Sequence, residues 1–497
     1  MNFIDALRNK DTFTENGMPT HSTTLNSCVD LFFQIGALRG SEKRRKLSLF
    51  SKAFDSNPLI AMKILFWVRD VRGGAGERQT YRDIIEYLAL YSCNVLLKNI
   101  HLMPEYGRWD DVLTLIGTDL EKDALELIAN ALENGNGLCA KWLPRGNGKN
   151  QIKKKQAKVI REYLKKTPKE YRKLLTSLSA TVENLMCNKE FSKIEYGKVP
   201  SKAMTTYMRA FTKNDGDRFS EYLESVSKGT DKINTGAIYP YDVTTNLKLL
   251  SDIVDDYNLT DEEKYKQVRD VSNGAMQQWN NLPDFMDGNK EMVLPLVDVS
   301  GSMDCPVGRS GNVTCMDVAI SLGLYISERN VGPFKDSFIT FSEEPELQHL
   351  KGNLVDRFNQ LSDSEWGYNT NIEAVFKLIL DKSVNNNVTK EDMPSIILIL
   401  SDMEFDVATN NNGLDMTAQE MITSLYSEHG YETPKIVYWN LNSRQDNCPV
   451  KFDEVGTSLV SGFSPSILKS ILGGKEMTPM SIMLETINQD RYSDIKI

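Results

Sequence analysis

The chain has 497 residues, of which 40% are hydrophobic and 25% charged, and its 58 Lys and Arg against 68 Asp and Glu give a net charge of −10. This composition is typical of a folded globular protein and excludes a long disordered segment, while the length predicts two or three domains of roughly 100–200 residues each. The charge is unevenly distributed: residues 286–497 hold 16 basic and 31 acidic residues, whereas residues 1–285 hold 42 basic and 37 acidic residues. We therefore expect the two parts to bind different partners.

Residues 1–285 are predicted to form an all-helical domain. Apolar residues recur there at intervals of three and four, and breakers such as R-G-G-A-G-E and E-N-G-N-G separate the periodic segments. The pattern predicts short helical hairpins without a strict repeat period. The predicted helices are Ser27–Leu38, Arg45–Phe54, Pro58–Val68, Tyr81–Tyr91, Trp109–Leu115, Lys122–Leu132, Gln156–Lys165, Lys169–Leu178, Ser201–Phe211 and Asp217–Ser227.

Residues 286–497 are predicted to form an α/β domain, because short β-branched runs alternate there with helical segments. The runs are uniformly apolar, as in strands that are covered on both faces, which predicts a parallel, doubly wound sheet. The predicted strands are Val293–Val297, Ser337–Phe341, Ser395–Leu400 and Lys435–Trp439, and the predicted helices are Asp317–Glu328, Asn371–Lys382 and Thr417–Ser427.

Oxygen-bearing side chains follow the predicted strands at three places. The segment V-L-P-L-V-D-V-S-G-S-M puts Asp298, Ser300 and Ser302 directly after a strand, Thr370 comes just before a helix, and Asp402 ends the strand I-I-L-I-L-S-D. The carboxyl ends of parallel strands meet at one edge of a sheet, so these five residues are expected to converge. Hard oxygen donors of this kind suit Mg²⁺ or Mn²⁺ rather than zinc.

Other interpretations of these loops stay open. A D-x-S-x-S loop without a metal is common, since Asp and Ser cap helices and turns. A serine hydrolase is disfavoured, because G-x-S-x-G is absent and neither His349 nor His429 has an evident role as a base. The R-G-G-A-G-E-R stretch lacks the Gly-Lys-Ser/Thr of a phosphate loop and is predicted to be a turn between helices. With no visible general base or nucleophile, we expect no enzymatic activity.

The three strand-end loops also carry a resemblance. Residues 286–497 resemble a von Willebrand factor A domain, whose metal-ion-dependent adhesion site has a D-x-S-x-S loop, a threonine loop and a strand-end aspartate. The residues that match those places are Asp298, Ser300, Ser302, Thr370 and Asp402. The resemblance implies a Rossmann-like fold and a Mg²⁺ site that binds an acidic group on a partner protein.

Stretches of the helical part carry a second resemblance: L-F-F-Q-I-G-A-L-R-G, F-S-K-A-F-D-S-N-P-L-I-A-M-K-I-L-F-W-V-R-D-V-R-G-G-A-G-E-R-Q and M-P-E-Y-G-R-W-D-D-V-L. They resemble the TROVE domain of the Ro ribonucleoprotein family, in which a ring of HEAT-like helical repeats is closed by an A domain. The resemblance covers nearly the whole chain and is closest to a branch seen in phages, bacteria and plants. It implies binding of small structured RNA or of the single-stranded ends of misfolded non-coding RNA, without identifying the RNA.

A basic stretch runs from Lys141 to Lys173, where 13 Lys and Arg stand against two Glu, with Trp and Tyr interleaved. Such a stretch suits a phosphate backbone, but a solvated helix face would have the same composition. Nothing in it reads bases, so specificity would come from RNA shape or from stacking on aromatic side chains. The predicted RNA-binding residues are Lys141, Trp142, Arg145, Lys149, Lys153, Lys154, Lys155, Lys158 and Arg161.

The predicted function is therefore that of a Ro-like, monomeric RNA-binding protein with a metal-binding A domain. The alternative is a metal-dependent protein-interaction scaffold that binds no nucleic acid. The N-terminus lacks the layout of a secretory signal and no apolar run reaches the roughly 20 residues of a membrane helix, so we expect a cytoplasmic protein that contacts no membrane. The seven cysteines form no C-x-x-C pair and are expected to be reduced thiols.

Overall fold

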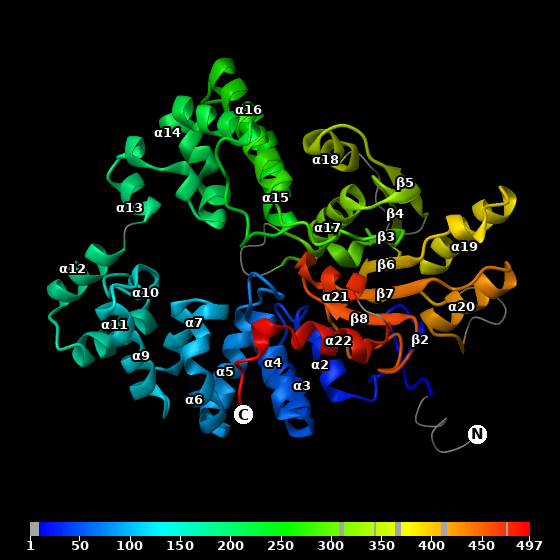
Figure 1. The fold of residues 1–497 in the computed structure, drawn as a ribbon, viewed down its shortest axis with the longest axis horizontal. Coiled ribbons are helices and arrows are strands. Elements are labelled where there is room, and N and C mark those ends of the chain that lie inside the picture. Colours follow the sequence, from blue (N-terminus) through cyan, green and yellow to red (C-terminus); the bar gives the residue numbers. More distant parts are fainter. Residues whose placement is uncertain are drawn as a thin grey trace.

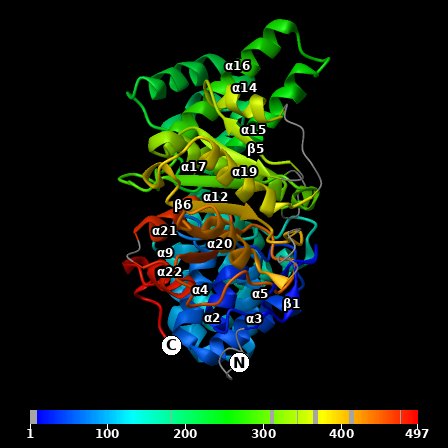
Figure 2. The same cartoon turned by 90° about the vertical axis from the view of Figure 1, so that its right-hand side faces the viewer.

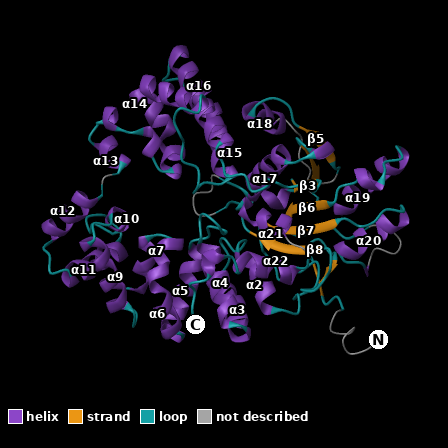
Figure 3. Ribbon diagram, in the orientation of Figure 1, coloured by secondary structure: helices purple, strands orange, loops and turns teal. Residues whose placement is uncertain are grey.

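The structure, a computed structural model, describes residues 9–497 except 180, 308–312, 342–343, 363–368, 409–414 and 474–475. Helices make up most of the first part of the chain, and the larger sheet belongs to the second part (Figure 3). The protein is thus a helical region followed by an α/β domain. The predicted boundary between residues 285 and 286 lies in the connection from α16 (Asp261–Asn280) to β3 (Val293–Asp298).

The helical region follows a short antiparallel hairpin, β1 (Thr12–Phe13) and β2 (Pro19–Thr20). Side chains of Asn26, Asn57 and Thr167 cap its helices by accepting hydrogen bonds from first-turn N–H groups. Its helices are α2 (Ser27–Ile35), α3 (Lys43–Ser56), α4 (Pro58–Arg69), α5 (Gln79–Tyr91), α6 (Cys93–Asn99), η1 (Ile100–Leu102), α7 (Met103–Tyr106), α8 (Trp109–Val112), η2 (Leu113–Leu115), α9 (Glu121–Glu133), α10 (Gly137–Trp142), α11 (Gln151–Tyr163), α12 (Pro168–Leu178), α13 (Val182–Cys187), η3 (Phe191–Lys193), η4 (Tyr196–Lys198), α14 (Ser201–Ser227), α15 (Pro240–Val254) and α16.

Each helix predicted in this region overlaps an observed one, but the long helices α15 and α16 were not predicted, and α14 differs from the prediction in its continuity. The two segments predicted on either side of the sequence K-N-D-G form one helix from Ser201 to Ser227. Asp215 interrupts it with φ −151° and ψ 39°, and its carboxylate accepts a hydrogen bond from Tyr196 Oη at 2.8 Å. The polar sequence therefore marks a kink at which the two predicted helical segments meet without a loop between them.

The α/β domain contains a six-stranded sheet in the order β5-β4-β3-β6-β7-β8. Every residue of β3, β4 and β6 is buried, as their apolar sequences predict, and every residue of β8, which was not predicted, is buried as well. Its strands are β3, β4 (Ser337–Phe341), β5 (Glu346–His349), β6 (Ile396–Ser401), β7 (Lys435–Asn440) and β8 (Thr457–Ser461); its helices are η5 (Gly301–Asp304), α17 (Cys315–Arg329), η6 (Gly332–Phe334), α18 (Leu354–Ser362), α19 (Ile372–Asn385), η7 (Lys390–Asp392), α20 (Ala418–Glu428), η9 (Pro465–Ile467), α21 (Leu468–Gly473), α22 (Pro479–Ile487) and η10 (Asp490–Tyr492).

The prediction of a wholly parallel sheet is wrong at one edge. Strands β3, β4, β6, β7 and β8 are parallel, but β5 pairs antiparallel with β4, with Ile339 opposite Leu347. Only four residues separate β4 from β5. A parallel neighbour needs a crossover of a dozen or more residues, so a connection this short permits only antiparallel pairing.

The register of the central strands sets the position of the candidate site. Val297 of β3 lies opposite Leu400 of β6, so Asp298 and Ser401 end neighbouring strands at the same edge of the sheet. In the sheet, β4 lies on one side of β3 and the later strand β6 lies on its other side, so the direction in which strands are added reverses at β3. Ligand sites of open parallel sheets lie at such reversals.

The helical region forms an arc that contacts the α/β domain at both of its ends (Figure 1). At the first end α2 packs against β8, and Gly36 is close enough that an added Cβ would lie 2.7 Å from the Ser461 carbonyl oxygen. At the second end α15 packs against α17. Figure 2 shows α2 to α5 on one side of the sheet and α14 to α16 on the opposite side.

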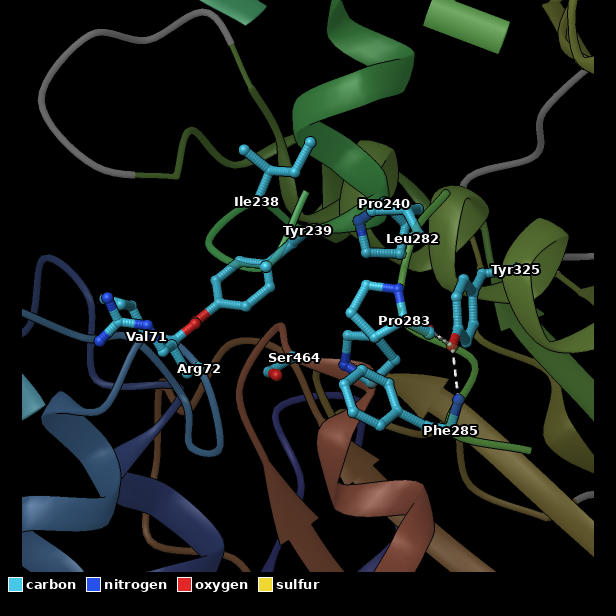
Figure 4. A pocket seen from close by; sticks show the side chains of 12 residues that line it. Val71, Arg72, Ile238, Tyr239, Pro240, Leu282, Pro283, Phe285, Tyr325 and Ser464 are labelled. Carbon is cyan, nitrogen blue, oxygen red and sulfur yellow. Dashed lines mark hydrogen bonds between the residues drawn. The ribbon is translucent and has the colours of Figure 1, made fainter. Parts of the chain in front are cut away.

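The two ends of the arc also meet each other, where residues of both line a small cavity with residues of the α/β domain (Figure 4). Tyr239, at the start of α15, donates a hydrogen bond through its hydroxyl to the Val71 carbonyl at 3.3 Å. Val71 lies beside R-G-G-A-G-E, which forms the predicted turn between α4 and α5, with Gly76 at φ +67° under the Tyr239 ring. The cavity measures about 20 Å³, which is room for one water molecule, so this junction is packed and holds no larger ligand.

Candidate functional site

The candidate metal site begins at the end of β3. Asp298 is fully buried, and its carboxylate accepts hydrogen bonds from the Ser300 N–H at 2.9 Å and from the Ser401 hydroxyl at the end of β6. The hydroxyl oxygens of Ser300 and Ser302 lie 3.1 Å apart. The D-x-S-x-S loop therefore folds back on its own aspartate and presents three oxygen-bearing side chains in one place.

Asp402 joins this cluster from the end of β6. Its carboxylate is 1% exposed and accepts hydrogen bonds from the Ser302 hydroxyl, from the Arg444 guanidinium at 2.9 Å and from the Glu404 N–H at 3.3 Å. The next residue, Met403, is buried and has φ +67°, a conformation that is uncommon for residues with a side chain. Backbone strain of this kind clusters at functional sites.

Both aspartates have raised pKa values. Burial, followed by the negative charge of Asp402, raises the pKa of Asp298 to about 7. Burial also raises the pKa of Asp402, against the opposing effects of Arg444 and Ser302, and raises the pKa of Glu404. Two buried carboxylates whose charges repel each other favour either a proton or a cation between them.

Thr370 reaches the site by a less direct route. It is 1% exposed, its N–H donates to the Asp406 carboxylate at 3.0 Å, and its carbonyl accepts from the Asp406 N–H at 3.1 Å. Asp406 is four residues beyond Asp402, so the threonine loop is fastened to the strand-end segment that carries the second aspartate. The residues Trp366 to Tyr368 of the predicted loop lie outside the described residues. The structure thus joins four predicted ligands by direct interactions and holds the fifth through Asp406.

The donor set fits a small hard cation. It consists of two carboxylates and two serine hydroxyls. The described residues contain no group of three or more His, Cys, Asp or Glu side chains that could hold a metal ion by themselves. An all-oxygen donor set with only two carboxylates suits Mg²⁺ or Mn²⁺ and does not suit zinc. Within the described residues Glu404 Oε1 is buried without a hydrogen-bond partner, so this edge also has an oxygen that lacks a donor.

Arg444 is the residue of this site that the sequence patterns did not identify. It lies four residues beyond β7, at the same edge of the sheet, and bridges Asp402 to Glu15, with nitrogen–oxygen distances of 2.9 and 2.8 Å. Glu15 belongs to the N-terminal hairpin, whose Thr14 hydroxyl donates to the Phe405 carbonyl at 2.7 Å. Its position after a parallel strand was the only available signal for Arg444.

Replacing Arg444 with Gln is expected to lower the free energy of unfolding by about 1–2 kcal/mol without metal, because buried Asp402 loses a charged hydrogen bond. In excess Mg²⁺ the loss should shrink, since a cation at the site supplies the missing positive charge. Urea unfolding with and without Mg²⁺ measures both values. An equal loss in both conditions would mean that Arg444 only fastens Glu15 and the N-terminal hairpin.

The predicted RNA-binding residues fall into two groups, of which the first lies on α11 and the loop before it. These side chains are exposed except for the half-buried Arg161, while Ala157 and Ile160 face the core. Glu162 lies 3.8 Å from Lys158 and from Arg161, and the other lysines have no acidic side chain within ion-pair distance in the described part of the chain. The members of this group are Lys149, Lys153, Lys154, Lys155, Lys158 and Arg161.

The second group lies at the end of α10 and is held in intramolecular contacts. Lys141 pairs with Glu183 at 3.3 Å, and Arg145 donates to the Ser179 hydroxyl at 3.0 Å. The guanidinium of Arg108 lies 3.9 Å from the ring centre of Trp142, so it covers one face of that ring. These three residues are therefore less available to a nucleic acid than the lysines of α11.

No helix in the described residues has the length and apolarity needed to cross a bilayer. The seven cysteines are free thiols, and Cys28, Cys139, Cys315 and Cys448 are buried. Cys305 and Cys315 flank the loop that follows the D-x-S-x-S segment.

Comparisons with known proteins match nearly the whole length of the chain. Residues 14–137 and 125–290 match a family model described as domain of unknown function DUF2828, and residues 293–494 match one described as domain of unknown function DUF7788. The chain is 30% identical over 526 residues to "Uncharacterized protein L728" of Acanthamoeba polyphaga mimivirus, in an alignment that covers 96% of this chain and 87% of the viral protein. These descriptions name no activity and no ligand.

Proposed function

The chain belongs to the family described as domain of unknown function DUF2828, and we propose that its members of this architecture bind RNA through α11 and bind Mg²⁺ or Mn²⁺ at the end of β3. The proposal keeps the resemblance to the Ro ribonucleoprotein family, with a helical arc of HEAT-like character followed by a domain like the von Willebrand factor A domain. The function is binding and not catalysis.

The observation that carries the proposal is the row of exposed lysines on α11 in a protein whose net charge is −10. Lys153, Lys154 and Lys155 are successive, so they fan around the solvent side of one helix, with Lys158 a turn further on. Phosphate groups attract such clusters without regard to base sequence. An acidic protein that concentrates exposed cations on one helix has a surface suited to a polyanion.

The metal part of the proposal is supported by the contacts among Asp298, Ser300, Ser302 and Asp402 and by the raised pKa values of the two aspartates. When bound, the cation would neutralise this pair and offer a coordination position to an oxygen ligand. The serine hydroxyls, Thr370 and Arg444 are the residues of this chain that would orient that ligand.

A second candidate function is favoured by the acidic charge of residues 286–497, which repels nucleic acid. In that case the α/β domain would grip an acidic group of a partner protein through the cation, and the helical arc would shape the assembly. The two candidates share the metal site and differ in whether RNA is bound.

Purification under low salt is expected to yield protein that carries RNA. The ratio of absorbance at 260 nm to that at 280 nm should be raised and should fall after ribonuclease treatment, because phosphate contacts persist at low ionic strength. Sequencing of crosslinked RNA would then identify the ligand. Protein that elutes without nucleic acid and shows no binding of a tailed structured RNA in Mg²⁺ would favour the scaffold.

A further inference from the structure

Two thiols lie against each other beside the candidate metal loop. The sulfur atoms of Cys305 and Cys315 are 3.2 Å apart. Cys305 directly follows η5, the turn that contains Ser302, and Cys315 is the first residue of α17. Each sulfur has a further polar neighbour, because Asn442 Nδ2 lies 3.1 Å from Cys305 and the Leu441 carbonyl oxygen lies 3.7 Å from Cys315.

The backbone holds the two cysteines in the register of a cross-strand pair. Pro306 and Thr314 form an antiparallel bridge, flanked by the hydrogen bonds from Cys315 N–H to the Cys305 carbonyl at 3.0 Å and from Val307 N–H to the Val313 carbonyl at 2.6 Å. Cys305 and Cys315 therefore lie opposite each other at the position of a hydrogen-bonded pair and share one of its two backbone hydrogen bonds, and for such a pair the expected Cα–Cα distance is about 5.5 Å. This falls within the range of about 4.4–6.8 Å that a disulfide requires, so bonding needs only small side-chain rotations.

We propose that Cys305 and Cys315 are a reversible disulfide site, and that their oxidation fastens the D-x-S-x-S loop to the start of α17. The proposal goes beyond RNA and metal binding and does not depend on either. The half-buried Cys305 is the thiol that an oxidant reaches, and the buried Cys315, 3% exposed, is the thiol that completes the bond.

The reaction balances with hydrogen peroxide as the oxidant. The Cys305 sulfur attacks one peroxide oxygen, the O–O bond breaks, and the leaving hydroxide takes a proton to become water, which leaves a sulfenic acid. The Cys315 sulfur then attacks the Cys305 sulfur, the S–O bond breaks, and the Cys315 proton leaves with hydroxide as a second water. Two electrons pass from the thiols to the peroxide, and a small thiol returns the pair to its reduced state by exchange.

The local hydrogen bonding agrees with this division of roles. The hydrogen bond with the Cys315 thiol lowers the pKa of Cys305, and the same bond raises the pKa of Cys315. The thiol with the lower pKa and the greater exposure is the one that reacts first with an oxidant, and a neighbouring thiol resolves the product. In the other cysteines the described structure shows no contact between two sulfur atoms.

The test is peptide mapping of the full-length protein after treatment with hydrogen peroxide and alkylation of the remaining thiols. Trypsin cuts after Arg309, between the two cysteines, so the peptides 291–309 and 310–329 stay together only if the disulfide has formed. We expect the linked pair after peroxide and the separate peptides after reduction. The oxidised protein should also unfold at a higher temperature than the reduced protein, because the new loop restricts the unfolded chain.

Two variants complete the test. Cys305→Ser should abolish both the linked peptide and the shift of the unfolding temperature, whereas Cys187→Ser, at an exposed thiol elsewhere, should leave both unchanged. Wild-type protein is sufficient on its own if Cys305→Ser does not fold. The proposal is overturned if peroxide yields peptides 291–309 and 310–329 unlinked, if either cysteine links to another thiol, or if the linked form unfolds at the same temperature as the reduced form.

Discussion

Replacing Asp298 with Asn is expected to abolish the stabilisation of this protein by Mg²⁺. A cation that binds only the folded chain stabilises it by about 3 kcal/mol when its concentration is about a hundred times the dissociation constant. Asn keeps the shape and one acceptor for the Ser300 N–H but removes the charge that a divalent cation needs. The measurement is thermal unfolding with and without Mg²⁺ at constant ionic strength.

The same variant should change the dependence of stability on pH in metal-free protein. The pKa of Asp298 is raised to about 7 in the folded chain, from its ordinary value of 3.8, so the folded chain binds this proton more tightly than the unfolded chain. Wild-type stability should therefore fall as the pH rises between these two values, and Asp298→Asn should flatten that fall. Over the same window the wild-type protein should gain affinity for Mg²⁺, because the metal binds the carboxylate form.

Asp304 provides the matched control for Asp298. It lies in η5 on the same loop, is exposed, and carries the same charge, so Asp304→Asn removes one negative charge without touching the buried cluster. This variant should retain the full response to Mg²⁺. If wild type and Asp298→Asn are stabilised equally, the oxygen cluster at the end of β3 is not a metal site.

The strand ends of the site were predictable because local patterns specify them. Runs of β-branched residues predict β3 and β6. Because these strands are buried on both faces, their sequences are uniformly apolar, and the polar residues that follow clearly mark where each strand ends. Asp298 and Asp402 then converge because parallel strands end at one edge. Thr370 was predicted from its position just before a helix and from the family resemblance, and the structure connects it to the site through Asp406.

Residues that act through distant contacts were not predictable from local patterns. Strand β5 is short and exposed at three of its four residues, so it has no apolar signal, and β8 begins with Thr457 and Ser458, whose burial depends on α2 and α22. Arg444 lies in a loop without periodicity, and its contact with Glu15 joins residues more than 400 positions apart. Such contacts form only in the folded chain, so no local sequence pattern indicates them.

The basic stretch shows the limit of composition as a guide to a binding surface. Counting charges gave equal weight to Lys141 and Lys154, but only the second is free of ion pairs among the described residues, since Glu183 neutralises the first. Trp142 was predicted to stack on a base, and Arg108 already covers one of its faces. The α11 lysines are therefore the better place to test RNA binding.

Replacing Lys153, Lys154, Lys155 and Lys158 with Glu is expected to weaken RNA binding about a hundredfold at roughly 0.1 M salt. Each phosphate contact to a single strand contributes a slope of about −0.7 to the plot of log affinity against log salt, so the loss of three to four contacts flattens the slope by roughly two to three units. The loss should be similar for unrelated RNA sequences, because phosphates carry no sequence information. Fluorescence anisotropy with a structured RNA bearing a single-stranded tail, titrated at several salt concentrations in Mg²⁺, gives both values.

A charge-matched variant separates a local contact from the general effect of added negative charge. Lys290, Lys351, Lys382 and Lys390 are exposed lysines outside α11, and their replacement with Glu changes the net charge by the same amount. Because the Debye length is about 10 Å at 0.1 M salt, charges far from the RNA should have little influence on its affinity. This control should bind nearly as tightly as wild type and keep the slope. If the α11 variant also keeps its affinity and slope, α11 is only a solvated face and the protein-interaction scaffold becomes the better explanation.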